Sequence, residues 1–119
     1  MVEIKNGLVA VKDLKPHPLN EKLYPLKVHA SNIELLSEKL YDEFVETGVP
    51  NHTPLDICPI TGTINSGHFR MYASQQMKDD KGNLVECDYL KANAGREFNP
   101  DYIIYDEMKF LDNHIQQDC

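Results

Sequence analysis

Tryptophan is absent from this chain of 119 residues, and long apolar runs are absent as well. No stretch approaches the roughly 20 apolar residues that a membrane-spanning helix needs. The first residues, 1–6, lack the charged and then apolar layout of a secretory signal peptide. These absences predict a cytoplasmic protein that has no membrane partner.

Cysteine is scarce, and its spacing excludes two common uses. Cys58, Cys87 and Cys119 are odd in number and far apart, and none belongs to a Cys-x-x-Cys pair. Zinc ribbons and redox dithiols depend on such pairs. The histidines show no ligand-like spacing either, so we predict no metal site built from the protein's own side chains.

Positive charge is also in short supply, because 12 Lys and Arg face 19 Asp and Glu, for a formal net charge of −7. An acidic chain repels phosphate backbones at long range, so we do not expect this domain to bind DNA by itself. The acid is concentrated after position 96, where six acidic residues stand against Lys109 alone. The rest of the chain is close to balanced and leaves room for a local anion site.

What the chain does have is a hydrophobic content of 41%, enough for one domain with a packed core. Apolar and β-branched segments predict strands at 8–14, 55–60, 63–65 and 84–90. Helical spacing and helix-start signals predict helices at 32–47, at 68–77 and from Asn99 onward. This order predicts an α+β fold with a small mixed sheet and packed helices. We expect residues 1–95 to form the domain and 96–119 to form an acidic C-terminal helix packed on it or extending it.

Three local patterns indicate where elements begin and end. Ser31 and Glu34 form a capping box at the start of the first long helix, and Gly48 supplies its C-terminal stop. The two prolines within 15–20 predict an extended path without regular structure. Thr61-Gly62 predicts a tight turn between two strands.

The segment Ser66-Gly67-His68-Phe69-Arg70 follows a predicted short strand and opens a predicted helix. The first amides of a helix lack intrahelical acceptors and lie at the positive end of its dipole, where phosphate binds well. Gly67 would allow a phosphate to approach the backbone closely. His68 could donate a hydrogen bond to a phosphate oxygen, and Arg70 could make a bidentate contact with the phosphate. The same spacing also fits an ordinary turn, with His68 satisfied by backbone and Arg70 paired with a surface acid.

Several blocks, in order, resemble the ParB N-terminal domain, a superfamily shared with sulfiredoxin. The segment 14–20, LKPHPLN, resembles the family's first box, and 53–57, TPLDI, resembles the start of its second strand. The segment 61–73, TGTINSGHFRMYA, resembles the signature hairpin followed by the Gly-x-x-Arg box. The long helix that ends at Gly48 matches as well, so the resemblance spans about residues 8 to 90.

In relatives, the Gly-x-x-Arg turn cradles a nucleoside triphosphate, either CTP or ATP. The resemblance therefore implies phosphate- or nucleotide-binding roles for Gly67, His68, Arg70, Ser66, Thr53 and Asn20. It implies a regulatory or recognition module in DNA-related processes of bacteria or their phages, with DNA reached only through another domain or partner. Oligomeric state stays open, although relatives often pair into homodimers around the nucleotide.

The departures from the family concern catalysis. His68 stands where sulfiredoxin has its catalytic cysteine, which argues against reductase activity. Ser66 stands where kinase-like relatives have an aspartate, and the turn lacks the carboxylate that helps partition proteins hold Mg²⁺. Glu21, from the first box, is a candidate for a substitute carboxylate, and the catalytic residues are otherwise unknown. The nucleotide could be accompanied by Mg²⁺. Two alternatives remain open: a small NTP-dependent phosphotransferase or NTPase that releases ADP or CDP in a Mg²⁺-dependent reaction, and a ligand-free interaction domain acting through the acidic helix.

Overall fold

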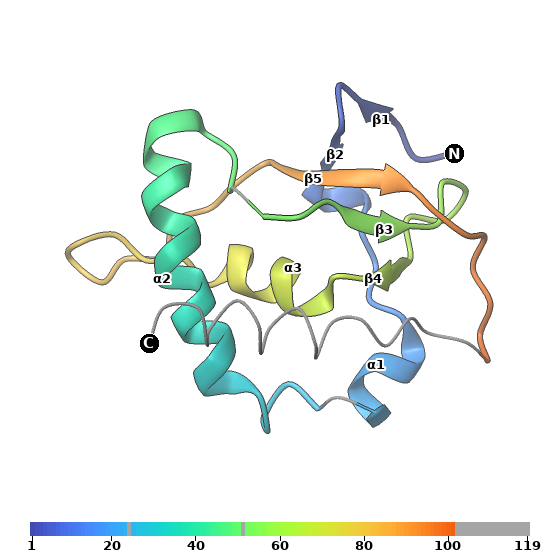
Figure 1. Ribbon diagram of the computed structural model, residues 1–119, viewed down its shortest axis with the longest axis horizontal. Coiled ribbons are helices and arrows are strands. Elements are labelled where there is room, and N and C mark those ends of the chain that lie inside the picture. Colours follow the sequence, from blue (N-terminus) through green and yellow to red (C-terminus); the bar gives the residue numbers. More distant parts are fainter. Residues whose placement is uncertain (24, 51, 102–119) are drawn as a thin grey trace.

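Five short strands form one mixed sheet in the computed structural model, which describes residues 1–23, 25–50 and 52–101 (Figure 1). The spatial order is β1-β2-β5-β3-β4. The strands are β1 (Ile4–Lys5), β2 (Leu8–Ala10), β3 (Leu55–Ile57), β4 (Ile64–Ser66) and β5 (Tyr89–Ala94). Strands β3 and β5 run parallel, whereas the other neighbouring pairs are antiparallel. The predicted α+β fold with a small mixed sheet is confirmed.

In the described part of the chain, three α-helices and a 3-10 turn accompany this sheet: η1 (Val11–Asp13), α1 (Pro18–Leu23), α2 (Ala30–Thr47) and α3 (His68–Gln75). Helix α3 lies between α2 and the strands, and α1 lies below the end of β4 in the view of Figure 1. The chain therefore runs from β4 directly into α3 at the centre of the molecule. The predicted helix at 68–77 and the hairpin before it are observed with small shifts at their ends.

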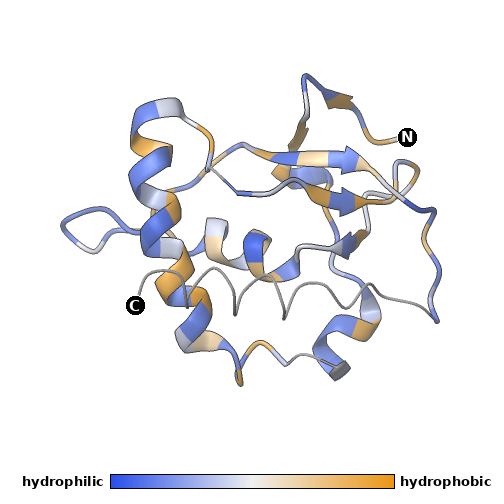
Figure 2. Cartoon of the chain, viewed as in Figure 1, coloured by the Kyte–Doolittle hydropathy of each residue, from blue (hydrophilic) through white to orange (hydrophobic). Residues whose placement is uncertain are grey.

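Helix α3 separates two apolar clusters. One joins α2 to α3 and consists of Ile33, Leu36, Leu40, Phe69, Ala73 and Met77. The other lies on the sheet and consists of Val9, Leu55, Ile57, Ile64, Met71, Leu90 and Ala92. Hydrophobic and hydrophilic residues alternate along α2 in Figure 2, as expected for a helix that buries one face. Packing on both sides holds α3 in place, and with it the turn at its start.

The long helix ends as predicted but does not begin as predicted. Gly48 adopts a left-handed conformation with φ of 80°, and its N–H donates to the carbonyl of Phe44 at 2.8 Å. This is a standard glycine stop. The helix begins at Ala30 with His29 as its N-cap residue, and no side chain caps it there. The capping box predicted at Ser31 is wrong, because Ser31 already lies inside the first turn.

The proline-containing segment 15–20 is not extended throughout. Helix α1 begins at Pro18, because proline is well suited to the first helical position, where no N–H is needed. The ring of His17 caps this helix, since its Nδ1 accepts the N–H of Leu19 at 3.0 Å. The prediction of an irregular segment was wrong from Pro18 onward.

The strand predicted at 55–60 ends at Ile57, and the first and last predicted strands also differ in extent from those observed. The first ends at Ala10 instead of residue 14, because Val11–Asp13 close a 3-10 turn in which Leu14 N–H donates to Val11 O at 3.1 Å. The last begins at Tyr89 instead of residue 84 and continues to Ala94. Both shifts follow from pairing, because β2 and β5 align Ala10 with Tyr89.

The acidic helix predicted within 96–119 lies outside the described residues beyond Asp101. At its expected start, the Asn99 side chain accepts the N–H of Asp101 at 2.9 Å, which is the contact a capping residue makes. Within the described ranges, the structure contains no helix that is both long and apolar enough to cross a bilayer.

Candidate functional site

The predicted anion-binding turn is a tight, glycine-dependent connection. Gly67 stands at the N-cap position of α3 with φ of 112°, in the left-handed region that side chains rarely adopt. A Cβ at this position would also overlap Cδ2 of Leu55. Glycine is therefore required by the packing of the turn, whether or not a ligand approaches it.

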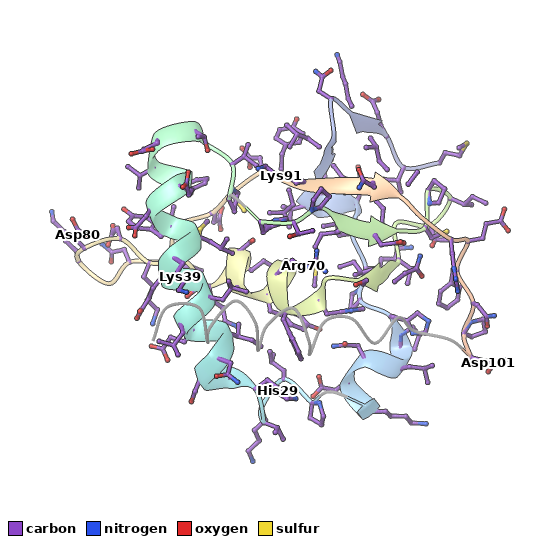
Figure 3. The ribbon with its side chains drawn as sticks, viewed as in Figure 1. His29, Lys39, Arg70, Asp80, Lys91 and Asp101 are labelled. Atoms are coloured by element: carbon purple, nitrogen blue, oxygen red, sulfur yellow. The ribbon has the colours of Figure 1, made fainter. Side chains whose placement is uncertain are left out.

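Arg70 lies in the interior between α3 and β3 (Figure 3) and is 5% exposed. Its Nη1 donates to the carbonyls of Thr53 and Pro54, each at 2.9 Å, and its Nη2 donates to Oγ of Ser66 at 3.3 Å. Hydrogen bonds from a charged donor contribute about 1.5–3 kcal/mol each. Arg70 thus ties α3 to the start of β3 and the end of β4, a structural role that the sequence prediction did not include.

His68 is fully buried, and its ring connects the turn to the proline-containing segment 15–20. The backbone N–H of His17 donates to Nε2 of His68 at 2.8 Å. Since an N–H can only donate, Nε2 is an unprotonated acceptor and the ring's proton is on Nδ1. His68 therefore holds the segment before α1 against the start of α3.

His17 extends this connection to the segment after β5. Its Nδ1 accepts from Leu19, so its Nε2 carries the proton and donates to the carbonyl of Asn99 at 2.8 Å. Its ring also lies 5.2 Å from the ring of Phe98, centroid to centroid. His17 therefore joins three separate segments beside the turn.

Asn20, from helix α1, is the unusual member of this group. Its side chain is fully buried, and neither its Oδ1 nor its Nδ2 has a hydrogen-bond partner within residues 1–23, 25–50 and 52–101. The backbone N–H of Asn20 donates to the carbonyl of His17 at 3.0 Å. Asn20 therefore lies one helical turn from His17, whose own N–H donates to His68. Burying unpaired polar groups costs about 1–3 kcal/mol.

The remaining predicted residues lie around Arg70. Ser66 is buried and accepts from Arg70, whereas Thr53 has an exposed side chain and takes part through its carbonyl. Glu21 is exposed, and its Oε2 accepts the N–H of Leu26 at 3.3 Å. The structure thus brings Ser66, Gly67, His68, Arg70 and the Thr53 backbone together, and it connects Asn20 to them through His17.

Sequence reasoning missed Asp56 and Asn65, which lie on neighbouring strands next to the turn. Asn65 donates to Oδ1 of Asp56 at 3.1 Å and to the carbonyl of Arg96 at 2.8 Å, and Asp56 is aligned with Ser66 in the β3–β4 register. Asp56 thus supplies a carboxylate near a turn that has none of its own. The hairpin prediction could have indicated this pairing, since Asp56 and Ser66 flank it.

His52 was also missed. Its Nδ1 donates to the carbonyl of Thr53 at 2.8 Å, and its Nε2 is buried without a partner in the described part of the chain. Burial, followed by the nearby charges of Arg70 and Lys91, lowers the pKa of His52 to about 4 despite the opposing bond to Thr53. His52 is therefore neutral at physiological pH.

Surface cavities of 480–630 Å³ lie on the molecule, and Asn20, His52, Gly67 and His68 do not line them. One of these cavities is lined in part by Pro54 and Lys91, which lie near Arg70 and His52. Among the described residues, His, Cys, Asp and Glu side chains do not gather in groups of three or more that could hold a metal ion. The side chains of Ser66, His68 and Arg70 at the turn are buried. Two further buried side chains, Asn20 and His52, have atoms that the described protein leaves unpaired.

Comparison with models of protein families, with curated proteins and with solved structures yields no match to this chain.

Proposed function

We propose that this protein is a nucleotide-binding domain of the ParB/sulfiredoxin-like type, which takes CTP or ATP at the β4–Gly67–α3 turn. The observation that carries the proposal is the Asn20 carboxamide, fully buried beside the turn with no described partner for either atom. Such a group is stabilised once a ligand supplies the missing donor and acceptor. The ordered sequence blocks on either side of the turn support the same conclusion.

The proposed role is a cytoplasmic regulatory or recognition module in bacterial or phage DNA transactions. The net charge of −7 argues that DNA is contacted through another domain or partner. The triphosphate would lie against Gly67 and His68, with Arg70 holding the turn in shape. Arg70 already donates to two carbonyls and a hydroxyl. Its contribution to binding the triphosphate is therefore smaller than the sequence pattern suggests. Pairing of two copies around the nucleotide is part of this proposal.

A second candidate function is a small NTP-dependent phosphotransferase or NTPase of the same fold. The observation that favours it is Asp56, which pairs with Ser66 in the β3–β4 register and whose carboxylate accepts from Asn65, where the turn itself carries no acid. A carboxylate at that position could bind the Mg²⁺ that accompanies a triphosphate. This function requires Mg²⁺-dependent release of a nucleoside diphosphate.

The test is thermal unfolding with each of the four ribonucleoside triphosphates, with and without Mg²⁺. A ligand at 100 times its Kd adds about 2.7 kcal/mol to the free energy of unfolding. We expect a shift with CTP or ATP in the wild-type protein, its loss in Asn20→Leu, and its retention in the exposed control Asn93→Leu. If the wild-type protein shows no shift with any nucleotide, the domain is a ligand-free interaction module instead. Diphosphate release in the same samples would favour the enzyme.

A further inference from the structure

His52 is a second buried side chain with an unpaired atom, and it shares a backbone acceptor with Arg70. It is 6% exposed and belongs to the connection between α2 and β3. The carbonyl of Thr53 accepts from both His52 Nδ1 at 2.8 Å and Arg70 Nη1 at 2.9 Å. This shared acceptor places the imidazole directly beside the guanidinium that supports Ser66.

The protonation state of His52 determines what it can bind. Because a carbonyl only accepts, Nδ1 carries the ring's proton, and Nε2 is left with a lone pair. The described residues supply no donor to that lone pair. Burial and the charges of Arg70 and Lys91 lower the pKa of His52 to about 4, so the ring stays neutral and Nε2 remains an acceptor.

An acceptor of this kind selects among the parts of a nucleotide. Phosphate oxygens are acceptors too and cannot bond to a neutral Nε2, whereas ribose hydroxyls and the N–H groups of a base are donors. We propose that Nε2 of His52 accepts a hydrogen bond from an O–H or N–H donor in the nucleoside part of the bound nucleotide. This inference rests on the nucleotide-binding function proposed above and assigns the sugar or base to the His52 side of Arg70.

Two substitutions at His52 separate the acceptor from the rest of the ring. His52→Asn places an amide near the position of Nδ1, where it can still donate to Thr53, but it lacks an acceptor at the position of Nε2. His52→Gln places an amide oxygen near the position of Nε2. Binding of CTP, ATP and inorganic triphosphate to both variants is measured by calorimetry, with Asn93→Leu as the control.

We expect His52→Asn to weaken the preferred nucleoside triphosphate about tenfold, the effect of one lost hydrogen bond that leaves a buried partner unpaired. Binding of inorganic triphosphate should not change, and His52→Gln should stay near wild type. If His52→Asn weakened the binding of the nucleotide and of inorganic triphosphate equally, the role of His52 would be purely structural and the inference would be overturned. Unchanged binding of the nucleotide by His52→Asn would overturn it as well.

Measurements on the wild-type protein keep the test decisive if either variant fails to fold. The 2′-deoxy, 3′-deoxy and base-N-methylated forms of the preferred nucleotide each remove one donor, so they distinguish the sugar from the base. We expect one of these analogues to lose about tenfold in affinity. If none loses affinity, or if inorganic triphosphate binds as tightly as the nucleotide, the His52 inference is wrong while the phosphate site stands. If the wild-type protein binds none of these ligands, both proposals are wrong.

Discussion

The two ends of helix α3 are buried for different reasons. Toward its C-terminus, Ala73 and the following Met77 pack with α2 in a mainly apolar cluster, and the buried Ser74 donates to the carbonyl of Arg70 at 2.8 Å. At its N-terminus, His68 and Arg70 are just as inaccessible, yet their partners are carbonyls, a hydroxyl and a backbone N–H. Burial of apolar groups stabilises a protein regardless of their orientation. A buried polar group, in contrast, is destabilising unless it forms hydrogen bonds.

This difference indicates which end of α3 is specialised. A domain of this size could bury apolar residues at both ends of the helix at lower cost. It instead gathers His17, His68 and Arg70 at one end, and it leaves atoms of Asn20 and His52 without described partners nearby. Deviations from efficient packing tend to coincide with function. The following predictions test whether the two ends respond differently to substitution, from the largest expected effect to the smallest.

The largest effect is expected at Arg70. Arg70→Met keeps an apolar stem but removes three hydrogen bonds and leaves the carbonyls of Thr53 and Pro54 without this donor. We expect the free energy of unfolding to fall by about 4 kcal/mol, measured by urea denaturation. The exposed Arg96→Met serves as the control and should lose less than about 1 kcal/mol. Similar losses in the two variants would show that the polar end contributes little to stability.

At the apolar end, the neighbouring residues Leu35 and Leu36 provide a matched pair. Leu36 is fully buried against α3, whereas Leu35 is 47% exposed. We expect Leu36→Ala to reduce the free energy of unfolding by about 3.5 kcal/mol through lost burial and a cavity, and Leu35→Ala to have a much smaller effect. Urea denaturation of both variants measures the difference. A large loss in Leu35→Ala would contradict the observed face of α2.

The pH dependence of stability should report on His52. Its pKa is lowered from 6.5 to about 4 in the folded protein, so the unfolded chain binds the proton more readily. The contribution of His52 to the free energy of unfolding is fully present above pH 6.5. About 3 kcal/mol of it is lost as the pH falls toward 4. Unfolding measured from pH 7 to pH 4 should therefore show a shallower decline in His52→Gln than in the wild-type protein. Parallel declines would mean that His52 titrates normally.

The smallest effect is expected at Asn20, and its sign is opposite. Without ligand, Asn20→Leu removes two unpaired polar atoms and adds no new polar group, so we expect stability to rise by about 1 kcal/mol. The control Asn93→Leu, on the exposed side of β5, should change it by less. A loss of stability in Asn20→Leu would show that the carboxamide has a structural partner, and the case for a ligand there would weaken.

How far the sequence predicted the fold depended on whether the signal was local. Helix α2 and its end at Gly48 were predicted, because the apolar spacing and a left-handed glycine are local features. The ends of β2 and β5 were not, because strand limits follow from pairing between segments about 80 residues apart. The start of α1 at Pro18 depended on a histidine cap, a residue that sequence rules do not favour at that position.

The sequence by itself determined an α+β domain with a glycine turn opening a helix at its centre, because periodicity and glycine placement act over a few residues. Only the tertiary structure decided what the polar residues of that turn do. It shows that Arg70 bonds to Thr53 and Pro54 and that His68 accepts from His17. It also shows that Asn20 and His52 retain unpaired atoms in the interior. Hydrogen-bond partners distant in sequence are set by the packing of whole elements, so no local pattern could have revealed them.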